Sequence, residues 1–130
     1  MIVIDASAAL EVLLGTPAAA AIEARLFQRP QPLCAPHLID VEIAHVLRRM
    51  AGGRQVDPQR CRDALDDWLL FTVTRYPQDL LLDRVWDLRQ NTSAYDAVYI
   101  ALAEALGAPL VTHDARLARA PGHKATIELI

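Results

Sequence analysis

The chain has 130 residues, 53% of them hydrophobic, with thirteen basic and sixteen acidic side chains and a net charge of −3. This length corresponds to about one domain, and the apolar content is enough for a core, so we expect a single domain over residues 1–130 and exclude a disordered tail. Charged residues interrupt every apolar stretch before the roughly 18 residues that a membrane span needs. We therefore expect a soluble, cytoplasmic protein with no membrane partner.

The cysteines indicate the redox compartment of the protein, and the arginines bear on the kind of partner it binds. Cys34 and Cys61 are too few for a disulfide scaffold and form no Cys-x-x-Cys pair, which favours a reducing compartment and a role as small buried residues. Twelve of the thirteen cations are arginine, whose planar guanidinium suits phosphate. The net negative charge, taken alone, argues against a polyanionic partner.

Short apolar runs alternate with segments that carry helix-start and helix-stop signals. For example, Thr16 and Pro17 are expected to be the cap and the first residue of a helix, and the pair Gly52 and Gly53 to end one. In chain order we expect strand 1–4, helix 8–14, helix 17–27, strand 33–35, helix 37–50, helix 58–68, strand 71–74, helix 77–89, helix 93–107, strand 110–112, helix 114–118 and strand 126–130. This order predicts an α/β fold, a three-layer α/β/α domain with a mainly parallel central sheet.

Two acids follow apolar strands directly. Asp5 comes after the first expected strand, and Asp114 comes two residues after the strand at 110–112. Ligands of such sheets bind beyond the carboxyl ends of the strands, so both acids lie where chemistry is expected. Each could also be a simple helix N-cap, because Asp is a preferred residue there.

A third acid interrupts an apolar helix face. Glu42 lies between Leu38 and Val46 on the stripe that the apolar residues of helix 37–50 form. A carboxylate directed toward a core needs a partner or a cation, because isolated burial would cost several kcal/mol or force protonation. A buried salt bridge, a position at the edge of the stripe and helix propensity are the alternatives. Asp40 points about 160° away around the helix and is not expected in the same site.

The fourth acid, Asp96, stands three residues after Ser93, which is the spacing of a capping box. Capping and metal binding are compatible, because the helix dipole stabilises an ionised carboxylate in the first turn and a metal ligand must be ionised. Together with the three acids above, it would form an all-oxygen cluster at one edge of the sheet. Such clusters suit Mg²⁺ or Mn²⁺, which activate water and stabilise displacement at phosphorus.

Four segments, each containing one of these acids, carry a family resemblance over essentially the whole chain. They are Ile2–Ser7, Glu42–Arg49, Tyr95–Glu104 and Leu110–Leu117. These segments resemble the PIN-domain ribonucleases and, more narrowly, the VapC toxins of toxin–antitoxin systems. The resemblance implies an endoribonuclease that uses Mg²⁺ or Mn²⁺ to cut RNA phosphodiester bonds and is silenced by a cognate VapB-like antitoxin.

The resemblance also implies roles for individual residues. Asp5 and Asp96 match the principal metal ligands of the family, and Glu42 and Asp114 match the acids that complete its catalytic pocket. Two further positions, Ser7 and Thr112, match hydroxyl residues of the family, and we expect them to orient the carboxylates.

Other expectations concern partners. Arg116, half a helical turn from Asp114, is a candidate contact for a phosphate or for the antitoxin. The four histidines have no zinc-site spacing, so zinc is not expected. The family commonly forms homodimers that bind the antitoxin in a hydrophobic groove, and the first two helices carry apolar residues that one small domain would leave partly uncovered: Leu10, Leu13, Leu14, Ile22, Leu26 and Phe27.

Two alternatives remain open at this point. One is an aspartyl-phosphate phosphatase or receiver domain with Asp5 as nucleophile, although position 7 is Ser where such phosphatases carry a second Asp, and Lys124 is the only Lys. The other is a catalytically silent PIN-like module that binds RNA or protein. The charge balance is compatible with RNA, because setting the four candidate ligands aside leaves twelve acids against thirteen cations.

Overall fold

The computed structural model describes residues 1–130 and is built around a five-stranded sheet in the order β3-β2-β1-β4-β5. All four strand pairings are parallel. The strands are β1 (Ile2–Ile4), β2 (Leu33–Pro36), β3 (Val73–Tyr76), β4 (Leu110–Thr112) and β5 (Ile127–Leu129).

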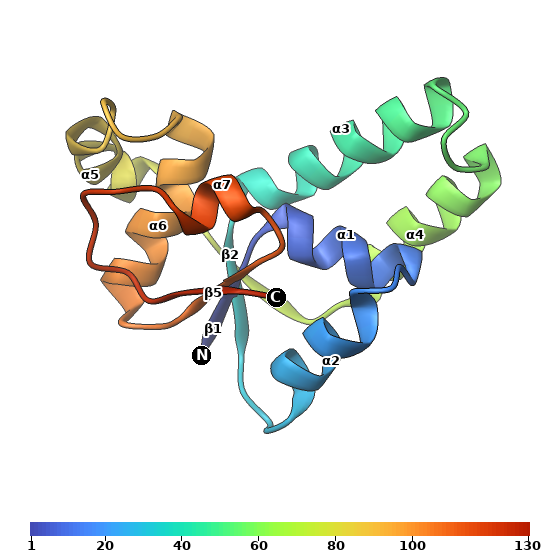
Figure 1. Ribbon diagram of the computed structural model, residues 1–130, viewed down its shortest axis with the longest axis horizontal. Helices are drawn as coiled ribbons and strands as arrows, with labels where there is room; N and C mark the ends of the chain where they lie inside the picture. Colours follow the sequence, from blue (N-terminus) through green and yellow to red (C-terminus); the bar gives the residue numbers. More distant parts are fainter.

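Helices cover both sides of this sheet, as expected for a three-layer α/β/α fold. They are α1 (Ala6–Leu14), α2 (Ala19–Phe27), α3 (Leu38–Gly52), α4 (Pro58–Leu70), α5 (Leu82–Asp87), α6 (Ala94–Leu106) and α7 (Ala115–Ala118), with a 3-10 turn η1 at Asp79–Leu81. Figure 1 shows α1 to α4 on one side of the strands and α5 and α6 on the other.

A single cluster of 33 buried residues forms the core. Its centre is α6, in which every residue from Ala97 to Ala103 is buried, as is typical of a helix that is apolar all round. Cys34 and Cys61 are free and buried, in agreement with the expected role as small core residues. No single helix is long and apolar enough to cross a membrane, and the one pair that reaches this length together, α1 and α2, is bent by 114°.

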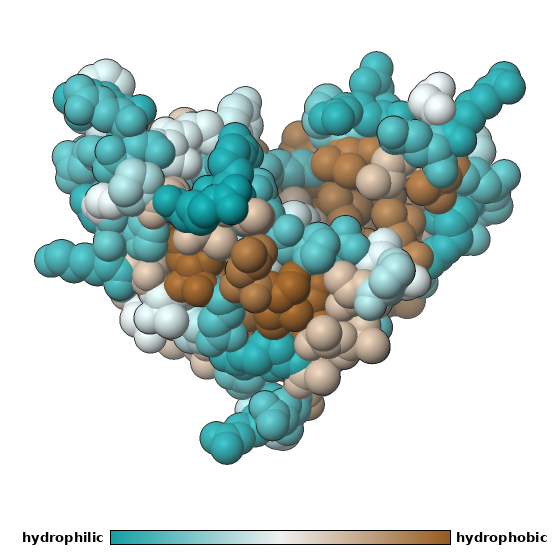
Figure 2. All heavy atoms as spheres, in the orientation of Figure 1, coloured by the Kyte–Doolittle hydropathy of each residue, from teal (hydrophilic) through white to brown (hydrophobic).

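The order of the strands places a crevice at the carboxyl ends of β1 and β4. After β1 the chain adds β2 and β3 on one side of it, and then returns to add β4 and β5 on the other. In open parallel sheets this switch of direction is where ligands bind. Asp5 directly follows β1, and Asp114 lies two residues beyond β4. Figure 2 shows the molecular surface hollowed into a notch between two lobes.

One expected strand is shifted along the chain and one expected helix is broken. The strand expected at 71–74 is observed at Val73–Tyr76, because α4 continues to Leu70 and Phe71 packs its ring against Trp68, with centroids 5.8 Å apart. The helix expected at 77–89 is broken into η1 and α5. Its first turn is tightened by a hydrogen bond from the Leu81 N–H to the Gln78 carbonyl, three residues back.

The expected capping role of Thr16 is also wrong. The helix begins at Ala19, and its cap, Ala18, makes no side-chain hydrogen bond. The Thr16 hydroxyl instead donates to the carboxylate of Glu11, while its carbonyl accepts from the Ala19 N–H at 3.0 Å. A tight turn after Gly15 therefore takes up the residues that the Thr-Pro signal assigns to the helix.

The first two helices leave less apolar surface uncovered than expected. Of the six residues singled out there, four are buried and one is half-buried, because α1 packs on α2, α3 and α4. Only Phe27 is largely exposed. Other exposed apolar side chains lie in segments for which no such surface was expected, namely Leu69, Leu70, Leu80, Leu82 and Trp86.

Candidate active site

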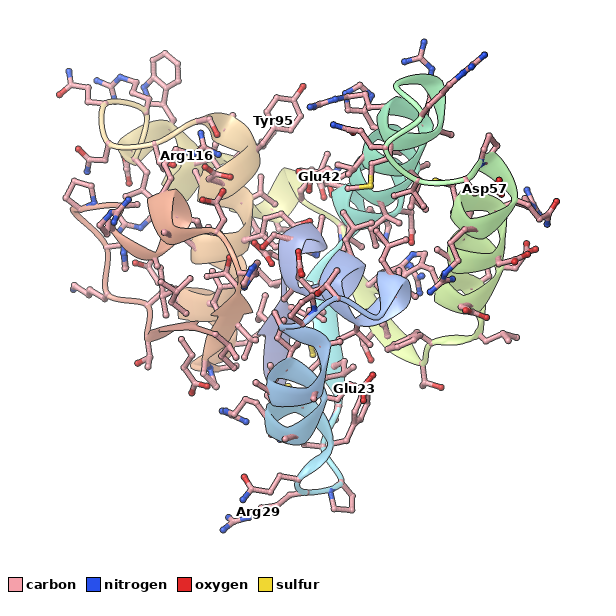
Figure 3. All side chains as sticks on the ribbon, turned by 45° about the vertical axis from the view of Figure 1, so that its right-hand side comes forward. Glu23, Arg29, Glu42, Asp57, Tyr95 and Arg116 are labelled. Atoms are coloured by element: carbon pink, nitrogen blue, oxygen red, sulfur yellow. The ribbon has the colours of Figure 1, made fainter.

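The four acids singled out by the sequence line one pocket of about 330 Å³ at the crevice between β1 and β4. Asp5 and Asp114 reach it from the two strand ends, Glu42 from α3 and Asp96 from the first turn of α6. Arg116 lines the same pocket. In Figure 3, Glu42 and Arg116 approach the notch from opposite sides. Acids that are up to 109 positions apart in the sequence are thus brought together by the sheet order.

Asp5 is 5% exposed, and three hydrogen-bond donors hold its carboxylate. It caps α1 by accepting a hydrogen bond from the Ala8 N–H at 2.9 Å. The Ser7 hydroxyl lies 2.8 and 2.9 Å from the two carboxylate oxygens. The Thr112 hydroxyl donates to Oδ2 at 2.6 Å. The cap and the site therefore coincide, and the orientation of the carboxylate is set on both oxygens.

Ser7 and Thr112 also tie the two strand ends together. Ser7 Oγ accepts from the His113 N–H at 2.9 Å, and Thr112 Oγ1 accepts from the Asp114 N–H at 3.0 Å. The two hydroxyl oxygens are 3.2 Å apart. Each hydroxyl thus donates to Asp5 and accepts from the loop after β4, an arrangement that positions both acids relative to each other.

Burial raises the pKa of Asp5 above its ordinary value. Hydrogen bonds from Ala8, Thr112 and Ser7 oppose this rise, and the negative charge of Asp114 adds to it. Without a bound cation, burial therefore disfavours the ionised form of Asp5, although the surrounding hydrogen-bond donors favour it.

Glu42 is half-buried on the flank of the apolar stripe of α3. The Tyr99 hydroxyl on α6 donates to Glu42 Oε1 at 2.5 Å. Burial raises the pKa of Glu42, the hydrogen bond from Tyr99 opposes this, and the charges of Asp5 and Asp96 add to the rise. Tyr99 is a site residue that the sequence did not reveal, because its place on an apolar helix indicated only core packing.

Asp96 lies in the first turn of α6, where its N–H donates to Ser93 Oγ at 3.2 Å. Ser93 therefore caps the helix as expected. Burial raises the pKa of the Asp96 carboxyl, and Asp114 contributes in the same direction, whereas the positive charge of Arg116 acts to lower it.

Asp114 is the exception among the four acids. Burial acts to raise its pKa, but hydrogen bonds from the Arg116 N–H, the Arg116 guanidinium and the Leu117 N–H outweigh burial, and the pKa is lowered. Asp114 caps α7 through the two backbone donors, at 2.8 and 3.4 Å. Arg116 Nη2 lies 3.3 Å from Asp114 Oδ2 and 3.1 Å from Asp96 Oδ2, so the guanidinium bridges two of the acids.

The donor set of the pocket fits a hard divalent cation. It offers carboxylate oxygens and no thiolate, which suits Mg²⁺ or Mn²⁺. Three of the four candidate ligands, Asp5, Glu42 and Asp96, have a raised pKa, because burial and then the neighbouring carboxylates disfavour their charged forms. As the side chains stand, no three His, Cys, Asp or Glu groups are close enough to share one ion. The guanidinium of Arg116 takes the place of a cation on Asp96 and Asp114.

Residues expected to lie outside the site do so. Asp40 faces the other way and accepts hydrogen bonds from Arg75 at 2.7 and 2.9 Å and from Trp68 Nε1 at 2.7 Å. Lys124 lines a different pocket, beside Glu104. An aspartyl-phosphate site centred on Asp5 would therefore have no lysine beside it.

Comparison with known proteins identifies the family. A model of the PIN domain matches residues 2–123. Ribonuclease VapC9 of Mycobacterium tuberculosis is 49% identical over 117 residues, which cover 90% of this chain and 88% of VapC9. Ribonuclease VapC1 of the same species is 41% identical over 129 residues, covering 98% of this chain and 96% of VapC1.

Solved structures show the same fold. The crystal structure of VapBC2 from Rickettsia felis, bound to a DNA fragment from its promoter, superimposes with a TM-score of 0.70 over 99% of this chain and 98% of that one, at 14% identity. At this identity the likeness shows the fold alone, whereas the two mycobacterial relatives match in sequence over nearly their full length. The chain therefore belongs to the PIN domain family and, within it, to the VapC ribonucleases.

Proposed function

We propose that this protein is the toxin of a toxin–antitoxin pair, an endoribonuclease that hydrolyses RNA phosphodiester bonds with Mg²⁺ or Mn²⁺ and is neutralised by a VapB-like antitoxin. The observation that carries the proposal is the convergence of Asp5, Glu42, Asp96 and Asp114 on one pocket. The family supports the ribonuclease activity, since relatives that match most of the chain are named ribonucleases.

Asp5 and Asp96 are the residues proposed to hold the ion, with Glu42 and Asp114 completing its surroundings. A bound divalent ion would activate water and stabilise charge that develops at phosphorus. Such an ion would also stabilise the charged forms of Asp5, Glu42 and Asp96, whose pKa values are raised first by burial and then by repulsion from neighbouring carboxylates. The chemistry of the pocket and the need of its charges for a cation thus support the same proposal.

The residues around the acids have proposed positioning roles. Ser7 and Thr112 hold both oxygens of Asp5 by donating their hydroxyl protons. Tyr99 holds Glu42 in the same way from the opposite helix. Arg116, at the mouth of the pocket and 71% exposed, is placed to contact a phosphate of the RNA or an antitoxin that covers the site.

The family and the exposed apolar surface support two proposed protein partners, an antitoxin and a second copy of the chain. A toxin–antitoxin complex of the same fold supports a VapB-like partner. The exposed apolar side chains Phe27, Leu69 and Leu70 supply surface that an antitoxin or a second copy of the chain would cover, and we propose a homodimer. A nuclease that acts on cellular RNA would work in the cytoplasm.

The proposal is tested by incubating the purified protein with RNA in the presence of Mg²⁺, Mn²⁺ or excess EDTA. We expect cleavage with either ion and none with EDTA. Asp96→Asn should lose cleavage, whereas Asp66→Asn, which removes a similar carboxylate from the exposed face of α4, should retain it. Cleavage that continues in EDTA would overturn the metal dependence. Unchanged cleavage by Asp96→Asn would overturn the assignment of the site.

If the protein binds RNA equally well with and without EDTA and yields no products, the catalytically silent module is the correct description. If acetyl phosphate instead leaves an acid-labile phosphate on Asp5, the aspartyl-phosphate alternative is correct.

A further inference from the structure

Arg116 is the only cation among the residues that line the acid pocket. Its Nη2 atom lies 3.1 Å from Asp96 Oδ2 and 3.3 Å from Asp114 Oδ2, on two carboxylates that come from different elements of the fold. No other side chain binds this guanidinium. The pocket is therefore lined by one cationic side chain, which lies between two of the four candidate ligands, and by a fifth acid, Glu11.

The four carboxylates need such a charge. Asp5 and Asp114 repel each other, and Glu42 is repelled by both Asp5 and Asp96. Arg116 is the cation that acts to lower the pKa of both Asp96 and Asp114. The guanidinium forms ion pairs with these two acids. As the side chains stand, no three acids are close enough to share an ion. An ion that bound to Asp96 would meet the guanidinium at the same carboxylate.

We propose that Arg116 is the internal counter-ion of the pocket when no divalent ion is bound, and that the ion and the guanidinium compete for Asp96 and Asp114. This inference rests on the proposed metal-dependent function and adds to it a residue that sets the affinity for the metal. Arg116 weakens metal binding in the free protein, and the bound ion releases it.

The guanidinium can leave Asp96 and Asp114 without a change in the fold. The Arg116 side chain is 71% exposed, so solvent surrounds most of it and no packing holds it in the pocket. The backbone of α7 is held separately, because Asp114 caps it through the N–H groups of Arg116 and Leu117. Once displaced, the guanidinium remains at the mouth of the pocket, where it can bind a phosphate. Its phosphate contact and its contact with Asp96 are then mutually exclusive.

The test is the affinity of the RNA-free protein for Mn²⁺, measured by titration calorimetry. Exposed ion pairs contribute about 0.2 to 1 kcal/mol each, so we expect loss of the two pairs in Arg116→Ala to tighten Mn²⁺ binding roughly 2- to 30-fold. Arg119→Ala is the matched control. It removes the same kind of cation three residues along the chain, where it is exposed and contacts no acid, and it should bind Mn²⁺ as the wild type does.

Thermal unfolding supplies a second readout that needs no RNA. Without metal, Arg116→Ala should unfold at a lower temperature than the wild type, because two acids lose their neutralising partner. With saturating Mn²⁺ the difference should vanish or reverse. Arg116→Lys keeps the charge but not the planar fork, so its Mn²⁺ affinity should lie between those of the wild type and Arg116→Ala.

The possible results separate this inference from the proposed function. Equal Mn²⁺ affinity of the wild type and Arg116→Ala would overturn the inference and leave the metal-dependent nuclease intact. If RNA cleavage also fell in that case, Arg116 would be a phosphate contact only. Failure of both proteins to bind Mn²⁺ would overturn the inference together with the metal dependence.

Discussion

The hydroxyl of Tyr99 donates a hydrogen bond to Glu42 Oε1 at 2.5 Å, which joins α6 to α3 across the floor of the acid pocket. Tyr99 is 2% exposed, and burial, followed by the negative charge of Glu42, raises its pKa. The phenol therefore stays protonated and acts as a fixed donor. Its partner, Glu42, has no other hydrogen-bond donor from the protein.

Removing this hydroxyl should impair the site without disturbing the fold. In Tyr99→Phe the buried ring is kept, but Glu42 loses the bond that lowers its pKa. We expect a fall of about 10- to 100-fold in Mn²⁺ affinity or in kcat/KM, measured by calorimetry and RNA cleavage. Tyr95→Phe is the matched control, because Tyr95 is exposed on the same helix. Equal activity of both variants would show that Tyr99 serves packing alone.

Thr112 should matter through its hydroxyl and not through its size. It is fully buried, donates to Asp5 and accepts from the Asp114 N–H. Thr112→Val preserves the shape but removes one donor from Asp5 and the acceptor of the Asp114 N–H, so we expect cleavage to fall about 10- to 100-fold. Thr112→Ser keeps the hydroxyl and should retain most of the activity. Similar rates of cleavage for the Val and Ser variants would contradict this role.

The candidate ligands could be recognised from the sequence because each occupies a position with a clear local meaning. Asp5 and Asp114 follow apolar strands, Asp96 stands in a capping turn, and Glu42 interrupts an apolar stripe. The parallel sheet then brings these positions to one edge. Local pattern and sheet topology thus suffice to predict that these four acids meet.

The contacts that orient these acids could not be recognised in the same way. The Tyr99–Glu42 bond spans 57 residues and depends on how two helices pack across the sheet. Arg116 lies close to Asp114 in sequence, but its contact with Asp96 depends on the position of α7 relative to α6. The prediction of one strand boundary was wrong for a related reason. Phe71 has the character of a strand residue, yet its ring packs on Trp68 after the end of α4.

Asp40 should prove to be a structural acid. Its carboxylate accepts from Arg75 and Trp68, and so connects α3 with β3 and α4. Because the ion pair is partly exposed, we expect Asp40→Asn to lower the free energy of unfolding by about 1 to 2 kcal/mol, measured with urea. Its kcat and Mn²⁺ affinity should be unchanged. A loss of activity at normal stability would place Asp40 in the site.

Asp5 should make the stability of the metal-free protein depend on pH. Burial raises its pKa above the ordinary value of 3.8, so folding favours the protonated carboxyl. The ionised form therefore destabilises the fold above the raised pKa, and this cost is absent below 3.8. Asp5→Asn cannot ionise and should gain stability relative to the wild type as the pH rises to neutral.

Urea unfolding in EDTA at several pH values measures this difference. A relative stability of Asp5→Asn that is constant with pH, or that increases on acidification, would contradict the raised pKa. Saturating Mn²⁺ should stabilise the wild type at neutral pH more than it stabilises the variant, because the ion neutralises a charge that the variant lacks.

The most direct test of the account is to locate the ion itself, by anomalous diffraction from crystals of the protein grown with Mn²⁺. We predict an anomalous peak inside the pocket, in contact with Asp5 and Asp96, with the Arg116 guanidinium moved away from Asp96. The absence of a peak there would contradict the claim that these acids form a metal site, and a peak with Arg116 still bridging Asp96 and Asp114 would contradict the competition between the ion and the guanidinium.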